Sequence, residues 1–183
     1  MRLLFKLKGG NWGVILSRGE ILAAVRRGGI AITPFNPANV GACSVDLTLS
    51  SEFRTFKRGG YARLSEGLDY RKFTTPTVAS VARPLKLAPG RLVLGATAER
   101  VRLSDRYCAW IQGRSRVARL GLSVHVSSSL VQPGVDNVQV LEVVNNAPFP
   151  IALVPGVRVC QLVFEELKGR ARYSGAFRTQ ATP

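Results

Sequence analysis

Three arginines and a serine stand between glycines in residues 113–122, Gly-Arg-Ser-Arg-Val-Ala-Arg-Leu-Gly-Leu. A strand is predicted to end at Gln112–Gly113, and Ser115 is predicted to cap a short helix that Gly121 ends. Ser115 and Arg119 would share one helix face because they are four residues apart. Guanidinium groups and helix-start amides both bind phosphate. The segment therefore indicates a polyphosphate site, and the alternative interpretation is a solvated basic turn.

A second candidate is Glu142, which stands inside the apolar run Val138–Val144. A carboxylate among apolar strand neighbours is costly unless it is paired or faces a cleft. If partly buried, it should have a raised pKa, in the range useful for a general base. Alternation leaves a second interpretation open, because Val140, Glu142 and Val144 share a face that could meet water at an edge. Together, the arginine turn and this acid indicate an enzyme acting on a nucleotide-like anion.

The chain has few residues for other kinds of catalysis. His125 is the only histidine, and no Gly-x-Ser-x-Gly elbow accompanies it, so a structural role at a strand end is the simpler interpretation. The His-x-Glu and Pro-Cys-x-x-Cys motifs of zinc nucleobase deaminases are absent. Cys43, Cys108 and Cys160 form no Cys-x-x-Cys pair. We therefore expect neither a zinc site nor a disulfide framework.

The Pro133–Gly134 pair precedes the Glu142 strand and predicts a tight turn. Residues 122–131 and 138–145 would then form a β-hairpin. Such a hairpin could form one wall of a small-molecule pocket, with backbone groups placed to hydrogen-bond the edge of a nucleobase. The alternative is a hairpin with no role beyond the scaffold.

Composition and charge indicate one globular domain over residues 1–183 that attracts anions. Hydrophobic residues make up 46%, and 26 Lys and Arg against 11 Asp and Glu give a net charge of +15. The basic residues are scattered, so a nucleic-acid partner is not indicated. Residues 1–8 are basic and apolar but too interrupted for a secretory signal, and no run is long enough to span a membrane. A cytoplasmic protein is expected.

The remaining signals position these residues on a mainly β scaffold. A capping box, Ser17 with Glu20, predicts one N-terminal helix that Gly28 ends. Residues 56–80 resemble a long polar excursion, and the basic tail 168–183 is expected to be flexible until a ligand orders it. Short runs broken by Gly, Pro and Asn predict strands of a barrel or sandwich at 44–49, 91–94, 109–112, 122–126, 138–144, 151–154 and 157–164.

In this order the motifs resemble those of the deoxycytidine triphosphate (dCTP) deaminases, of the trimeric dUTPase superfamily. The matching strings are Gly-Arg-Ser-x-x-Ala-Arg-Leu-Gly-Leu-x-Val-His-Val, x-Pro-Gly, Leu-Glu-x-x-Asn and Pro-Ile-x-Leu-x-Pro-Gly-x-x-x-x-Gln-Leu-x-Phe. Residues 43–57 are similar to the family's N-terminal motif, and Tyr173–Gln180 to its closing segment. The resemblance implies a distorted β-barrel of jelly-roll type, a dUTPase-type fold. It also implies a homotrimer with active sites where subunits meet.

The resemblance further implies zinc-free deamination of dCTP to dUTP and ammonia, with Mg²⁺ held by the triphosphate. Glu142 would be the general base. Arg119 would orient Glu142 and the attacking water, and Ser115 would bond near the amino group and phosphate. The expected substrate-binding residues are Arg114 on phosphate, His125 and the backbone of Val126 in the pocket wall, and Tyr173 and Gln180 folded over the nucleotide.

Three departures from the family pattern bear on the reaction. Gln132 stands where the family has aspartate before Pro-Gly, which argues against dUTP hydrolysis and bears on sugar recognition. Arg116 replaces a serine in the phosphate turn, where it would add a contact or clash. Ala176 and Phe177 replace lysine and tyrosine in the closing segment, which removes one triphosphate contact. The alternatives are a dUTPase, a bifunctional enzyme yielding dUMP, and a non-catalytic nucleotide-binding relative.

Overall fold

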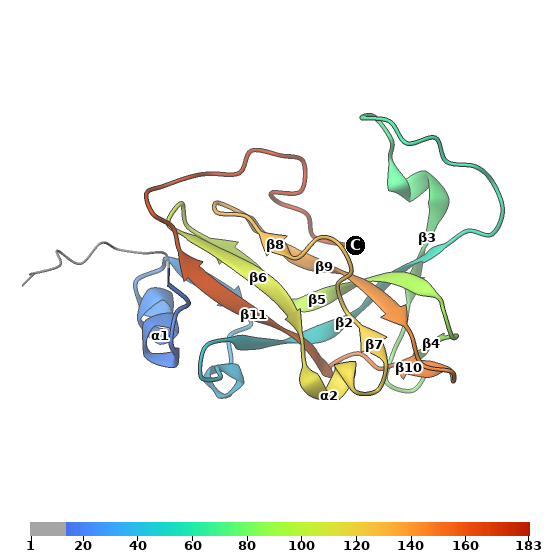
Figure 1. Cartoon of the computed structure of the whole chain (residues 1–183), viewed down its shortest axis with the longest axis horizontal. Helices are drawn as coiled ribbons and strands as arrows, with labels where there is room; N and C mark the ends of the chain where they lie inside the picture. The colour runs from blue at the N-terminus through green and yellow to red at the C-terminus, as the bar shows by residue number, and fades with distance from the viewer. Residues whose placement is uncertain (1–13) are drawn as a thin grey trace, which may run out of the picture.

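The computed structural model describes residues 14–183, so the predictions for residues 1–8 lie outside it (Figure 1). The predicted N-terminal helix is present as α1, Arg18–Arg26, and Gly28 follows it with a positive φ of 71°. The capping box is wrong, because the Ser17 side chain makes no cap hydrogen bond. Glu20 lies 3.9 Å from the Arg27 guanidinium instead. Among the described residues, no helix is long and apolar enough to cross a membrane.

Eleven strands build the rest of the described chain, and all their pairings are antiparallel. The main sheet has the order β7-β9-β5-β2-β11-β6-β8, with β1 added to β5 and β3 added to β2, while β4 and β10 form a separate pair. The strands are β1 Ile30–Thr33, β2 Val45–Phe56, β3 Thr74–Val78, β4 Leu85–Leu87, β5 Leu92–Leu103, β6 Tyr107–Gly113, β7 Leu122–Ser123, β8 Leu130–Val131, β9 Asp136–Asn145, β10 Ile151–Leu153 and β11 Arg158–Glu166.

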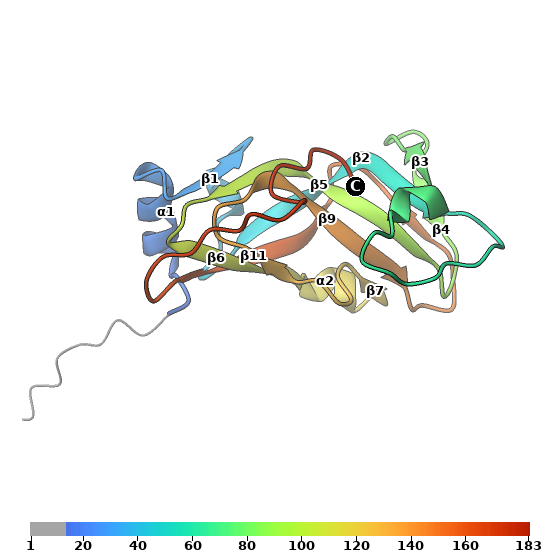
Figure 2. The same ribbon diagram turned by 90° about the horizontal axis from the view of Figure 1, so that it is seen from above.

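The main sheet curls into an open, distorted barrel (Figures 1 and 2), which confirms the predicted fold class. Strands β2, β5 and β11 each contain a register shift, and such bulges let a long strand bend. Alternate residues point inward, as β9 shows with every second side chain buried. Phe53, Leu141 and Phe164 are fully buried in the core that these inward faces share.

Two predicted segments differ from the structure. The excursion at residues 56–80 includes the short 3₁₀ helix η2, Tyr70–Phe73, and the strand β3, which pairs with β2. The run 122–126 forms a strand only at Leu122–Ser123. β3 carries no strand signal in the sequence, because most of its side chains are polar or exposed and only Thr74 is buried.

The two strands of the predicted hairpin pair only at the end far from the Pro133–Gly134 turn. Leu122 and Ser123 pair with Asn145 and Val144, but β8 leaves β9 and pairs with β6. The turn itself is fixed elsewhere, since the Gly134 N–H donates to the carbonyl of Leu103. The two halves of the hairpin therefore separate around β9, and this separation forms the site described next.

The C-terminal segment, residues 168–183, lies along the edge of β9 that the hairpin leaves open. The N–H of Asp136 donates to the Arg178 carbonyl at 2.8 Å, and the N–H of Val138 donates to the Gln180 carbonyl at 3.2 Å. Figures 1 and 2 both show the segment running back over β8 and β9. It thus closes the side of the separated hairpin that would otherwise face solvent.

Candidate active site

The Glu142 carboxylate is held by the loop between β7 and β8. Its Oε2 accepts the backbone N–H groups of Val126 at 2.7 Å, Ser127 at 2.6 Å and Ser128 at 3.4 Å. Its Oε1 accepts the Ser127 hydroxyl at 2.8 Å. Residues 126–128 therefore bind the carboxylate as three amides and one hydroxyl. The loop binds Glu142 in the region where it has no strand pairing with β9, since that pairing ends at Ser123.

These hydrogen bonds set the protonation state of Glu142. Burial alone would raise the pKa of this carboxyl, but the amide and hydroxyl of Ser127, with the amides of Val126 and Ser128, outweigh it. The pKa of Glu142 therefore lies below its ordinary value of 4.5. The expectation of a raised pKa was wrong, because donors to a carboxylate stabilise its charged form. Glu142 is ionised at neutral pH and can accept a proton.

A pocket of about 340 Å³ opens beside Glu142, where the hairpin halves separate. We call it the Glu142 pocket. Apolar side chains of β5, β6, β8 and β9 form much of its wall, and η2 adds Tyr70. Two guanidinium groups lie over the ring of Tyr70, with their carbon atoms 5.9 Å (Arg54) and 5.6 Å (Arg71) from the ring centroid. The pocket combines one carboxylate, an aromatic ring and apolar walls, which suits a planar ring beside a reacting polar group.

Three of the predicted substrate-binding residues line this pocket with Glu142: Gln132, Tyr173 and Gln180. Gln132 comes from the turn after β8, whereas Tyr173 and Gln180 come from the C-terminal segment. The N–H of Tyr173 donates to the Pro133 carbonyl at 2.8 Å, which fixes the segment to that turn. The structure thus brings together residues that are far apart in sequence and closes the pocket with the chain's own tail.

The predicted phosphate residues lie apart from the Glu142 pocket, in the four-residue helix α2, Ser115–Ala118, and at its two flanking positions, Arg114 and Arg119. Ser115, Arg116 and Arg119 are all exposed. Within residues 14–183 their side chains make no ion pair, and none lines the Glu142 pocket. The capping prediction is wrong here too, because Ser115 is the first helical residue and Arg114 occupies the cap position.

Arg114 points back into its own chain. Its guanidinium lies 3.0 Å from Asp46 Oδ2 and donates to the Arg158 carbonyl at 3.0 Å. Arg158 also reaches Asp46, at 3.3 Å. Arg114 is therefore positioned by Asp46, a carboxylate of the N-terminal motif.

His125 and Val126 occupy two different places although they are neighbours in sequence. His125 is half-buried in a separate hollow of about 310 Å³ between the α2 turn and Asn146. The Val126 side chain is exposed, and its amide binds Glu142. Only the backbone of Val126 therefore belongs to the Glu142 pocket in this chain.

Sequence reasoning missed several residues of the pocket. Asn137 and Gln139 are buried and line it, and they are joined by a hydrogen bond of 2.7 Å from Gln139 Nε2 to Asn137 Oδ1. Asn137 Nδ2 donates to the Phe177 carbonyl at 2.6 Å, which connects the pocket floor to the tail. A signal for both existed, because polar residues occupy inward positions of an alternating strand. Among the described residues, no group of three or more His, Cys, Asp or Glu side chains is placed to hold a metal ion.

The chain thus combines an open antiparallel barrel with a carboxylate pocket that its own tail closes. A model of the dCTP deaminase-like family matches residues 15–167, and this chain belongs to that family. It is 32% identical over 177 residues to a protein named dCTP deaminase, dUMP-forming, from a Nocardioides species, with 93% of each chain covered. It is 35% identical over 163 residues to a dCTP deaminase of Halorubrum lacusprofundi, covering 87% of this chain and 80% of that protein.

A solved structure supports the fold. The crystal structure of 2'-deoxycytidine 5'-triphosphate deaminase from Agrobacterium tumefaciens matches 84% of this chain with a TM-score of 0.66 and 20% sequence identity. This chain spans 49% of the length of that protein. The predicted dUTPase-type architecture is therefore confirmed at the level of the fold.

Proposed function

We propose that this protein deaminates dCTP by hydrolysis, with Glu142 as the general base. The placement of Glu142 supports the proposal most strongly: an ionised carboxylate, held by four hydrogen bonds, at the wall of a pocket sized for a pyrimidine. Membership of the dCTP deaminase-like family, and relatives named for that substrate, supply the reaction class.

The proposed reaction follows from what an ionised carboxylate can do. Glu142 takes a proton from water as the water oxygen forms a bond to C4 of the cytosine ring. The protonated Glu142 passes that proton to ring nitrogen N3, which gives a tetrahedral adduct with a hydroxyl and an amino group on C4. Glu142 then carries the hydroxyl proton to the exocyclic nitrogen, the C4–N bond breaks, and ammonia leaves as the C4 carbonyl forms. Positioned acid–base groups of this kind contribute about 10²–10⁴-fold to a rate. Mg²⁺ enters this scheme with the triphosphate, as part of the substrate.

We further propose that a second copy of the chain completes the site, within a homotrimer. Ser115, Arg116 and Arg119 are exposed on α2 and lie outside the Glu142 pocket, so a triphosphate held by them needs a Glu142 pocket from a neighbouring copy. In a cyclic trimer every interface is heterologous, so it joins the same two different surfaces of neighbouring copies. In this arrangement Arg119 of one copy would orient the water beside Glu142 of another.

The test is ammonia release from dCTP and Mg²⁺ by the purified protein. Wild-type protein is expected to release ammonia, whereas Glu142→Gln, which keeps the shape but not the basicity, should lower the rate by at least about 10²-fold. Unchanged oligomeric state in the variant shows that the loss is chemical. A wild-type protein without ammonia release, but stabilised thermally by dCTP, would instead identify a non-catalytic nucleotide-binding relative.

A bifunctional reaction that ends at dUMP is the second candidate. It is favoured by relatives named dUMP-forming, including one that matches 93% of this chain. Gln132 argues against it, since an amide in the pocket wall cannot accept a proton as a carboxylate does. Chromatography of the product mixture separates the two candidates, because dUTP and dUMP differ by pyrophosphate.

A further inference from the structure

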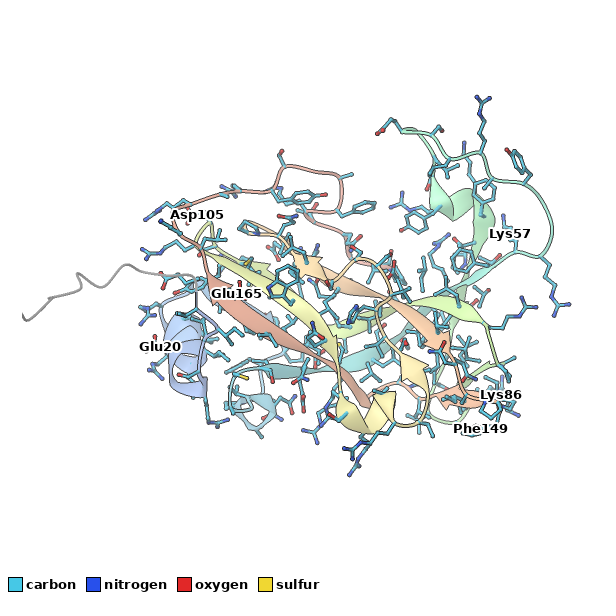
Figure 3. All side chains as sticks on the ribbon, in the orientation of Figure 1. Glu20, Lys57, Lys86, Asp105, Phe149 and Glu165 are labelled. Carbon is cyan, nitrogen blue, oxygen red and sulfur yellow. The ribbon has the colours of Figure 1, made fainter. Side chains whose placement is uncertain are left out.

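A second hollow, of about 770 Å³, lies on the other side of the C-terminal segment from the Glu142 pocket. It opens where α1 ends and β5 turns into β6, near Asp105, which Figure 3 labels. The charged residues that line this hollow, here named the arginine cleft, are Arg102, Asp105, Asp136, Arg170, Arg172 and Arg178.

The carboxylates of the arginine cleft are already paired. Asp136 Oδ1 accepts from Arg100 Nε at 2.6 Å, and Asp105 lies 3.2 Å from Arg170. Within residues 14–183 the structure gives no ion pair or side-chain hydrogen bond to the three other guanidinium groups of the cleft. Three unpaired guanidinium groups around one hollow favour a phosphate-bearing anion, which they can bind through bidentate forks. These groups are those of Arg102, Arg172 and Arg178.

The C-terminal segment separates the arginine cleft from the Glu142 pocket and contributes side chains to both. Tyr173, Phe177 and Gln180 line the Glu142 pocket, whereas the arginines of the same segment line the cleft. Val135 lines both hollows, so they are neighbours. Whatever binds the cleft therefore contacts the same stretch of chain that closes the Glu142 pocket.

The turn beneath the segment is shaped for this contact. A Cβ atom on Gly134 would lie 2.5 Å from Arg172 Cγ, and Gly134 has a positive φ of 80°. Glycine there allows the stem of Arg172, which lines the cleft, to pack on the turn. Arg102, by contrast, projects from β5, which belongs to the barrel.

We propose that the arginine cleft binds a small phosphate-bearing anion, which joins Arg102 on the barrel to Arg172 and Arg178 on the C-terminal segment. The bound anion holds the segment against the Glu142 pocket. This site is separate from the triphosphate contacts proposed for α2. It depends on the position of the segment and not on whether the protein deaminates dCTP.

Limited digestion with trypsin, which cuts after arginine, tests this proposal on the whole protein. Inorganic tripolyphosphate is the probe, and mass spectrometry follows cleavage after Arg170, Arg172 and Arg178. Tripolyphosphate is expected to protect these bonds in the wild-type protein, since ordering a segment suppresses its local opening. In Arg102→Gln, which leaves the tail sequence intact, half-protection should need about ten-fold more tripolyphosphate, as expected for one lost charge-assisted contact.

Two further variants make the result specific. Arg63→Gln removes the same charge from the exposed loop between β2 and η2, which lies at the opposite end of Figure 1 from α1, and this variant should be protected like wild type. Arg119→Gln removes an α2 phosphate contact and should also keep protection. The proposal is overturned if wild type is not protected, if Arg102→Gln behaves as wild type, or if Arg63→Gln or Arg119→Gln loses as much protection as Arg102→Gln. Ammonia release, measured separately, reports on the deamination proposal alone.

Discussion

The Glu142 pocket and the α2 turn hold the two halves of the proposed chemistry in opposite ways. Glu142 accepts four hydrogen bonds from residues 126–128 and sits beside a pocket that the chain closes with its own tail. Ser115, in the four-residue helix α2, and Arg119, which follows that helix, are exposed and make no ion pair among the described residues. The proposed general base, Glu142, is already positioned by its own chain. The anion-binding residues are exposed, so a ligand or a second copy of the chain is needed to position them. This difference predicts different consequences for mutations in the two regions.

Arg119→Gln is expected to give the largest change in activity that distinguishes the α2 turn from the Glu142 pocket. Because Arg119 is exposed and unpaired in the described chain, its loss should leave the free energy of unfolding within about 0.5 kcal/mol of wild type. Deamination should nevertheless fall by about 10²-fold, as expected when an orienting charge is removed. Parallel measurement of chemical denaturation and ammonia release checks both parts. A large loss of stability in this variant would mean that α2 is a structural element.

Ser127→Ala tests the opposite property of the Glu142 region. The Ser127 hydroxyl lowers the pKa of Glu142, so its removal should move that pKa up toward 4.5. A carboxyl with a depressed folded-state pKa stabilises the fold above its unfolded pKa, and this contribution is lost as pH falls through the folded pKa. The proposed reaction needs Glu142 in its ionised form. A higher pKa therefore makes the variant lose activity at a higher pH than wild type when the pH is lowered. At neutral pH its rate should be several-fold smaller. An unmoved acid limb would show that Glu142 does not govern the rate.

The smallest expected change is in the product. Gln132→Asp restores a carboxylate to the pocket wall that Tyr173 and Gln180 share. If the amide is what limits hydrolysis of the triphosphate, the variant should raise the dUMP fraction of the products while ammonia release stays within a few-fold of wild type. A wild-type protein that already yields only dUMP would show that Gln132 is no obstacle.

The sequence predicts the fold class and the identity of the main candidate residues because the motifs are local. Strand alternation placed Val140, Glu142 and Val144 on one face, and β9 does expose that face partly. The same local reasoning expected a raised pKa for Glu142. It could not foresee the amides of residues 126–128, because they reach Glu142 only after β8 leaves the hairpin to pair with β6.

Other features of the site could not be predicted from the sequence, for related reasons. Tyr70 belongs to a polar stretch with no strand signal, yet the chain folds η2 against the pocket. The pairing of Arg114, which follows β6, with Asp46 of β2 joins residues far apart in sequence, because β11 lies between these two strands in the sheet. Such contacts depend on tertiary arrangement, so neither periodicity nor motif spacing indicates them.

Mixing two inactive variants tests most directly whether the two regions meet between copies of the chain. Glu142→Gln and Arg119→Gln proteins are dissociated together, reassembled, and assayed for ammonia release from dCTP. If each site joins Glu142 of one copy to Arg119 of another, about a quarter of the interfaces in a 1:1 mixture combine the two intact residues, and activity returns to roughly that fraction of wild type. Activity no higher than that of the separate variants, with reassembly verified, would contradict a site shared between copies.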